Sequence, residues 1–105
     1  MNVILSIPLS EKNEAISLKN EFPELVSIAH SKKLIGAEDV IMMMIQVTTS
    51  FAPLLIDYLI KRKKENKKSS IKIDGIEVEY DTKEELELII EKYLIEEKKE
   101  ENNGD

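Results

Sequence analysis

The stretch from Val40 to Ile60 constrains the fold of this chain more than any other, because it is almost free of charge. It reads VIMMMIQVTTSFAPLLIDYLI and precedes a basic run that begins at Lys61. A stretch of this kind is either a buried helix or a membrane span, since about 20 apolar residues cross a bilayer. Gln46 and Asp57 argue against insertion, because an acid at the centre of a span costs roughly 2.5 to 3.5 kcal/mol. We therefore predict a central helix that is apolar almost all round because both of its faces are covered.

Two residues inside this predicted helix need an explanation. Pro53 lacks a backbone donor, so we expect either a kink or a break into two helices in the turn before it, where the polar residues 48–50 can satisfy the freed carbonyls. A buried and unpaired Asp57 would be costly. We expect it at a solvent-facing edge or paired with Lys61 one turn later, so it does not indicate an active site.

Composition indicates one compact domain. The chain has 105 residues, of which 42% are hydrophobic and 34% charged, and it has no cysteine. We expect a single α+β domain over residues 1–97 and a polar, frayed tail over 98–105. The apolar start is interrupted by Ser6 and Pro8, so it does not resemble a signal peptide, and we expect a cytoplasmic protein.

The first third of the chain alternates between strand and helix signals. Apolar residues at every second position predict a strand over 2–7, which Pro8 ends. Ser10 is a natural N-cap for a short helix over 11–20. Residues 25–30 then predict a second strand.

The clearest local signal is the Asp74-Gly75 pair between two alternating runs, which predicts a β-hairpin with a two-residue type I′ turn over 71–80. This turn sets a register that pairs Ile73 with Ile76, Ile71 with Val78 and Lys72 with Glu77. We therefore expect an α+β fold in which strand, helix, strand, long helix, hairpin and helix build a four-stranded sheet with helices packed on it.

Thr82 and Glu85 form a capping box that starts the last helix. Its core-facing stripe consists of Leu86, Ile89, Ile90, Tyr93 and Leu94. Leu88 and Ile95 are one heptad apart and lie off this stripe. They are either ordinary exposed apolar residues or a docking strip for another subunit, which residues from Met42, Met43 and Met44 would have to complete. The three methionines are in the first place adaptable core filler and only in the second a binding surface.

The basic run contains Lys61, Arg62, Lys63, Lys64, Lys67 and Lys68. Cations in the last turns of a helix interact favourably with its carbonyl end, which explains the run without a ligand. The alternatives are an acidic protein partner, a nucleic acid and membrane headgroups. The formal net charge of −6 and the lack of aromatic residues between the lysines argue against strong nucleic-acid binding.

No pattern of catalytic residues is present in the sequence. His30 is the single histidine and has no cysteine to pair with, and Glu38 and Asp39 are adjacent, so they point apart. The isolated glycines form no phosphate-binding loop, and no ligand spacing for a metal is present. We expect no catalytic, cofactor or metal site.

The layout of the chain resembles the effector-associated constant component family, small bacterial domains found beside effector modules in conflict and defence systems. The resemblance rests on Gly36-Ala37-Glu38 before the long apolar segment ending LLIDYLIKRKK, the hairpin SSIKIDGIEVEY and the helix EELELIIEKYL. It implies a non-enzymatic adaptor or scaffold that associates with an effector protein, and it implies no catalytic residue. The partner is then an effector or a second copy in a homo-oligomer. The alternatives are a membrane-associated regulator that uses residues 40–60 and an enzyme subunit that contributes to a shared site.

Overall fold

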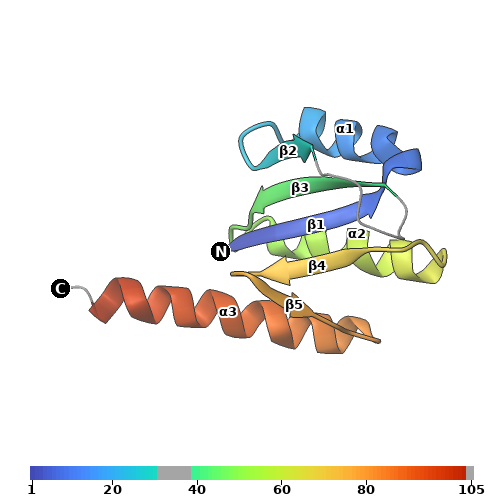
Figure 1. The fold of residues 1–105 in the computed structure, drawn as a ribbon. Helices are drawn as coiled ribbons and strands as arrows, with labels where there is room; N and C mark the ends of the chain where they lie inside the picture. The colour runs from blue at the N-terminus through green and yellow to red at the C-terminus, as the bar shows by residue number, and fades with distance from the viewer. Residues whose placement is uncertain (31–38, 104–105) are drawn as a thin grey trace.

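A computed structural model describes residues 1–30 and 39–103. These residues form one sheet and a layer of helices (Figure 1). The elements are β1 (Asn2–Pro8), a 3-10 turn (Leu9–Glu11), α1 (Lys12–Glu21), β2 (Val26–His30), β3 (Val40–Gln46), α2 (Ala52–Lys64), β4 (Ser70–Ile73), β5 (Ile76–Val78) and α3 (Lys83–Asn103).

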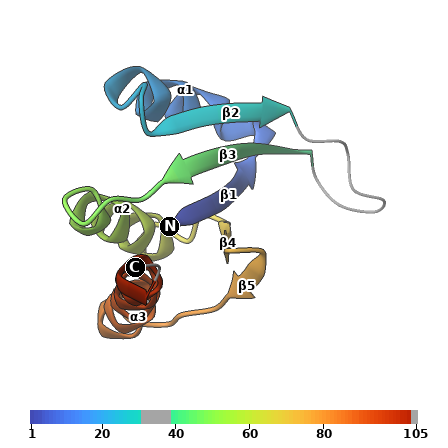
Figure 2. The same ribbon diagram turned by 90° about the vertical axis from the view of Figure 1, so that its left-hand side faces the viewer.

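The strands lie in the order β2-β3-β1-β4-β5, and every neighbouring pair is antiparallel. Up to β4, this order is the split β-α-β arrangement called ferredoxin-like. All three α-helices lie on one side of the sheet (Figure 2). The α+β class is confirmed, but the sheet of the described residues has five strands where we predicted four.

The predicted central helix over Val40–Ile60 is wrong, since its first third is the strand β3. Ile41, Met43 and Ile45 are buried on the helix side, whereas Met42 and Met44 point to the other side. β3 pairs with β1 on one edge and β2 on the other, so its backbone donors and acceptors are satisfied by its neighbours. A short apolar run gives no period that separates a central strand from a buried helix, which is why the prediction failed.

The predicted kink at Pro53, or break between two helices before it, is also wrong, because a strand precedes the turn and this proline lies in the first turn of α2. In the first turn a backbone N–H has no intrahelical acceptor, so proline loses no hydrogen bond there, and its ring favours the helical φ. The polar residues before it form the connecting turn: the backbone N–H of Phe51 donates to Thr48 Oγ1 over 3.1 Å, and the N–H of Ala52 donates to the carbonyl of Thr48 over 2.9 Å. Among the described residues, no helix is long and apolar enough to cross a membrane.

The hairpin has the predicted turn and register. Asp74 and Gly75 have φ values of 50° and 85°, as a type I′ turn requires at both positions. Ile71 and Ile73 of β4 are buried. Ile76, however, is 60% exposed, because β5 is short and forms the edge of the sheet.

The capping box at the start of α3 is present, since the backbone N–H of Glu85 donates to Thr82 Oγ1 over 3.2 Å. Leu86 and Ile90 of the predicted stripe are fully buried. The helix continues to Asn103, so the predicted boundary at residue 97 does not coincide with its end, and the division into domain and tail stays a prediction. The first helix differs in detail: a 3-10 turn comes first, and no side-chain hydrogen bond caps α1.

Candidate functional site

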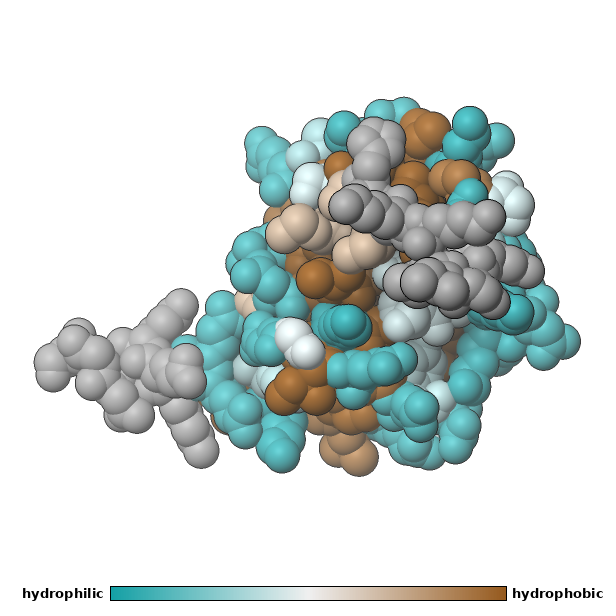
Figure 3. All heavy atoms as spheres, viewed as in Figure 1, coloured by the Kyte–Doolittle hydropathy of each residue, from teal (hydrophilic) through white to brown (hydrophobic). Residues whose placement is uncertain are grey.

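The side of the sheet away from the helices is its open face. The strand register places Ser27, Met44, Ile4, Lys72 and Glu77 in one row across this face, and Ala29, Met42, Ser6 and Ser70 in the next row. Apolar side chains gather along the middle of the face, with hydrophilic ones around them (Figure 3). Met44 is 51% exposed, although it belongs to a central strand. The open face is therefore the first candidate for an interaction site.

A cavity of about 460 Å³ lies at one end of the open face, and we call it the end groove. It crosses the start of β2, the end of β3, the start of β1 and the turn after β4. Ile4 and Met44, which face each other in the β1–β3 register, lie among its lining residues. Glu24 precedes β2 and Asp74 lies in the β4–β5 turn; both line the groove and are exposed.

The three methionines do not form one surface, and Met43 has the first of the two roles expected for them, that of core filler. Met43 is fully buried in the core, Met42 is partly buried, and only Met44 is exposed. The pleat of a strand sends successive side chains to opposite faces, so a run of three methionines is divided between core and open face. The prediction assumed a helix, in which successive side chains are about 100° apart and do not alternate between two opposite faces.

Leu88 and Ile95 on α3 are 67% and 47% exposed, as expected for residues off the core stripe. They belong to the helix layer, on the other side of the sheet from Met44 (Figure 2). The structure therefore does not bring the predicted strip on α3 together with the methionines, and whether the strip binds a partner stays a prediction.

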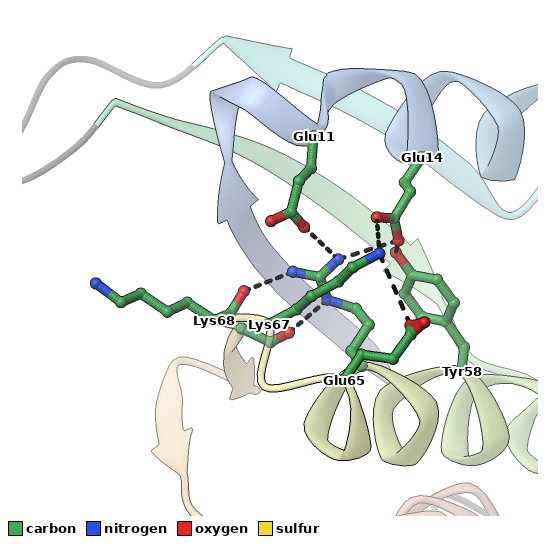
Figure 4. A network of polar contacts seen from close by, with 8 residues as sticks. Glu11, Glu14, Tyr58, Glu65, Lys67 and Lys68 are labelled. Carbon is green, nitrogen blue, oxygen red and sulfur yellow. Dashed lines mark hydrogen bonds and ion pairs between the residues drawn. The ribbon is translucent and has the colours of Figure 1, made fainter.

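One member of the basic run, Arg62, is buried, with an exposed fraction of 1%, and its guanidinium lies in a network of polar contacts (Figure 4). Its Nε donates to Ser69 Oγ over 2.6 Å and its Nη2 to the carbonyl of Lys68 over 2.6 Å. Its Nη1 lies 2.6 Å from Glu11 Oε1 and 3.0 Å from Glu14 Oε1. Arg62 thus ties the end of α2 to the start of α1 and to the loop before β4.

Glu14 connects this network to two more donors. Tyr58 Oη donates to its Oε1 over 3.1 Å, and Lys67 Nζ donates to its Oε2 over 3.0 Å. Burial by itself raises the pKa of Glu14, but the hydrogen bonds from Lys67 and Tyr58 and the charge of Arg62 outweigh it and lower the pKa. Burial and the charge of Glu14 raise the pKa of Tyr58 to about 12. At neutral pH the carboxylate is ionised and the phenol protonated, so the pair joins two elements and is not poised for proton transfer.

The basic run, which the sequence offered as a candidate electrostatic patch, is therefore divided. Arg62 and Lys67 are paired inside the network, and Lys63 Nζ donates to the carbonyl of Tyr80 over 2.6 Å. Lys61 and Lys64 have exposed side chains in the last turn of α2, where they complement the carbonyl end of the helix as expected. The side chain of Lys68 is also exposed.

Asp57 lies at a solvent-facing edge, which was one of the two expectations, but the expected pair with Lys61 was wrong. Asp57 is exposed, and its Oδ1 lies 3.2 Å from Nζ of Lys83 on α3, not beside Lys61. Sequence reasoning also missed Glu11, Glu14 and Ser69 as partners of the basic run. One signal was available: Leu55, Leu59 and Arg62 have the spacing of a core-facing helical stripe, which places the guanidinium inward.

The part of the chain that the structure describes contains no group of three or more histidines and acids that could hold a metal ion. His30 ends β2, but its side chain lies outside the described residues, as does the predicted helix start at Gly36–Glu38. No family model, no curated protein and no solved structure matches this chain.

Proposed function

We propose that this chain is a non-enzymatic binding module, an adaptor or scaffold that associates with a protein partner through the open face of its sheet. The observation that carries the proposal is the group of apolar side chains Ile4, Met42 and Met44 on the two central strands of that face. Antiparallel sheets that face water on one side usually place polar residues there. Here Met44 is 51% exposed and pairs with Ile4, which is only partly buried. A flexible thioether at such a position adapts to the surface of a partner.

The chemistry of the face favours a protein over a nucleic acid. Sheets that bind single strands stack the bases on aromatic side chains. The chain has three tyrosines and two phenylalanines, and none of them belongs to a strand. Lys72, a cation on this face, lies opposite the acid Glu77 in the hairpin register. Aliphatic contact with another protein is the interaction that these residues provide.

The resemblance of the chain to the effector-associated constant component family makes an effector protein of a bacterial conflict or defence system the partner that we propose, in the cytoplasm. Self-association is the second candidate. The observation that favours it is the exposure of Leu88 and Ile95 on α3, 67% and 47%, on a line away from the core stripe.

The test compares two variants with matched exposure. Met44→Ser changes the open face, and Leu54→Ser changes a residue of α2 that is 52% exposed. Chemical cross-linking and purification from the native source should give a stoichiometric partner with the wild type and with Leu54→Ser, and the purified partner should bind Met44→Ser more weakly. Wild-type protein that is recovered without a partner and sediments as a monomer would contradict the proposal.

A further inference from the structure

We infer that the end groove binds an extended segment of the partner in which an apolar residue lies between two basic residues, each two positions away. This inference rests on the proposed function and specifies the chemistry of the partner.

The charged residues that line the groove are acids, whereas Lys72 lies opposite Ile4 just outside the lining. Among the described residues that line the groove, the charged ones are Glu24 and Asp74. Neither carboxylate appears in an ion pair of the described residues, and both are exposed. A segment that carries arginine or lysine complements them, and a segment that carries acids is repelled.

The two acids lie at opposite ends of the groove. Glu24 lies just before β2 and Asp74 just after β4, and β3 and β1 separate these two strands. Three strand spacings amount to about 14 Å. Two carboxylates at this separation do not chelate one metal ion, whose ligands lie within about 2.6 Å of it. They are suited to two separate basic side chains of a bound segment.

The floor between the acids is apolar, because Ile4 and Met44 lie opposite each other in the central strands. An extended segment advances about 3.3 Å per residue, and every second side chain points to the same side. A side chain over the middle of the groove is therefore followed, about 7 Å away in each direction, by the next side chains that face the groove. This spacing gives the order basic, any residue, apolar, any residue, basic.

A second copy of this chain does not provide such a segment. In the whole sequence, no apolar residue has a lysine or arginine both two positions before it and two positions after it. The occupant of the end groove is therefore a different protein.

The experiment titrates the full chain with the peptide acetyl-Gly-Arg-Ser-Leu-Ser-Arg-Gly-amide and follows its amide resonances. We expect shifts at Ile4, Ser27, Met44 and Gly75. Three control peptides replace both arginines by glutamate, replace leucine by serine, or move the arginines next to leucine. Each control should bind more weakly, and salt should weaken the binding of the first peptide.

Two variants test the groove itself. The double variant Glu24→Gln with Asp74→Asn should weaken binding about tenfold, since it removes two exposed ion pairs. Asparagine at position 74 keeps the turn, because it also adopts a positive φ. Met44→Ser should weaken binding about fivefold by removing half-buried apolar contact. The matched control is Glu87→Gln with Glu91→Gln on α3, where both residues are exposed and the affinity should not change.

Equal binding of the glutamate peptide, or shifts confined to the helix side, would overturn the inference. A partner that docks on the open face but outside the end groove would overturn it too, while the proposed function would stand. A chain that binds the peptide in the end groove but has no protein partner in its native source would support the inference and contradict the proposed function.

Discussion

Replacing Arg62 by methionine tests the network that joins α1, α2 and the loop before β4. Methionine keeps most of the apolar stem but removes the donors that reach Glu11, Glu14, Ser69 and the carbonyl of Lys68. Removing one partner of a buried ion pair typically costs about 3 to 5 kcal/mol, because it leaves the other charge without compensation.

The lower end of that range applies here. Glu11 Oε1 is buried, but the side chains of Glu11 and Glu14 as a whole are 23% and 31% exposed. They can turn toward water, and Lys67 keeps its ion pair with Glu14. We expect a loss of about 3 kcal/mol in the free energy of unfolding. For a domain of this size that loss lowers Tm by about 12 to 20 °C. A domain with a typical total of about 5 to 15 kcal/mol remains folded.

The assay is urea unfolding followed by circular dichroism, with Lys64→Met as the control. Lys64 is exposed in the same helical turn, so its replacement should change the free energy of unfolding by less than about 0.5 kcal/mol. Arg62→Lys should lie between wild type and Arg62→Met, since an ammonium does not reproduce the planar fork. A cost below about 1 kcal/mol for Arg62→Met would refute the conclusion that the guanidinium is buried and holds these elements together.

Three further outcomes follow from single features of the fold. Thr82→Ala should lower the free energy of unfolding by about 1 kcal/mol in thermal or urea unfolding, because it removes the capping bond at the start of α3; an unchanged value would mean that the box does not stabilise the helix. The phenol of Tyr58 should ionise near pH 12 by ultraviolet titration, above its ordinary value of 10.0, because of burial and Glu14. Because folding raises this pKa, the contact contributes stability that is complete below pH 10 and lost as pH rises through about 12. Ionisation of Tyr58 at the ordinary value would show that the contact with Glu14 is absent. Leu88→Glu with Ile95→Glu should leave the chain folded, and it should reduce the sedimenting mass if α3 mediates self-association; an unchanged mass and unchanged partner binding would make the strip ordinary surface.

Features that a few adjacent residues define were predictable from the sequence. Asp74 and Gly75 specify a type I′ turn, and the turn length then sets the hairpin register, whatever the rest of the chain does. The capping box of Thr82 and Glu85 and the buried stripe of Leu86 and Ile90 are equally local, since each depends on spacing along one helix.

The candidate site was not predictable in the same way. Met44 was among the predicted interface residues, but for a reason that assumed a helix, and Glu24 and Asp74 had no role in the prediction. Residues distant in sequence meet at the end groove because the ends of four neighbouring strands lie together at one end of the sheet. That meeting depends on the strand order, which the sequence does not show directly.

The apolar character of residues 40–60 was evident from the sequence, and so was the need to cover it. The tertiary structure decided that its first part is a strand, because β1 and β2 offer hydrogen bonds on both edges and the core takes every second side chain. It also decided that Arg62 is buried while Lys61 remains exposed, because the 3-10 turn and α1 bring Glu11 and Glu14 to one side of α2. Local patterns specify turns, caps and stripes. The balance between burial and exposure depends on which neighbours the whole fold places beside each residue.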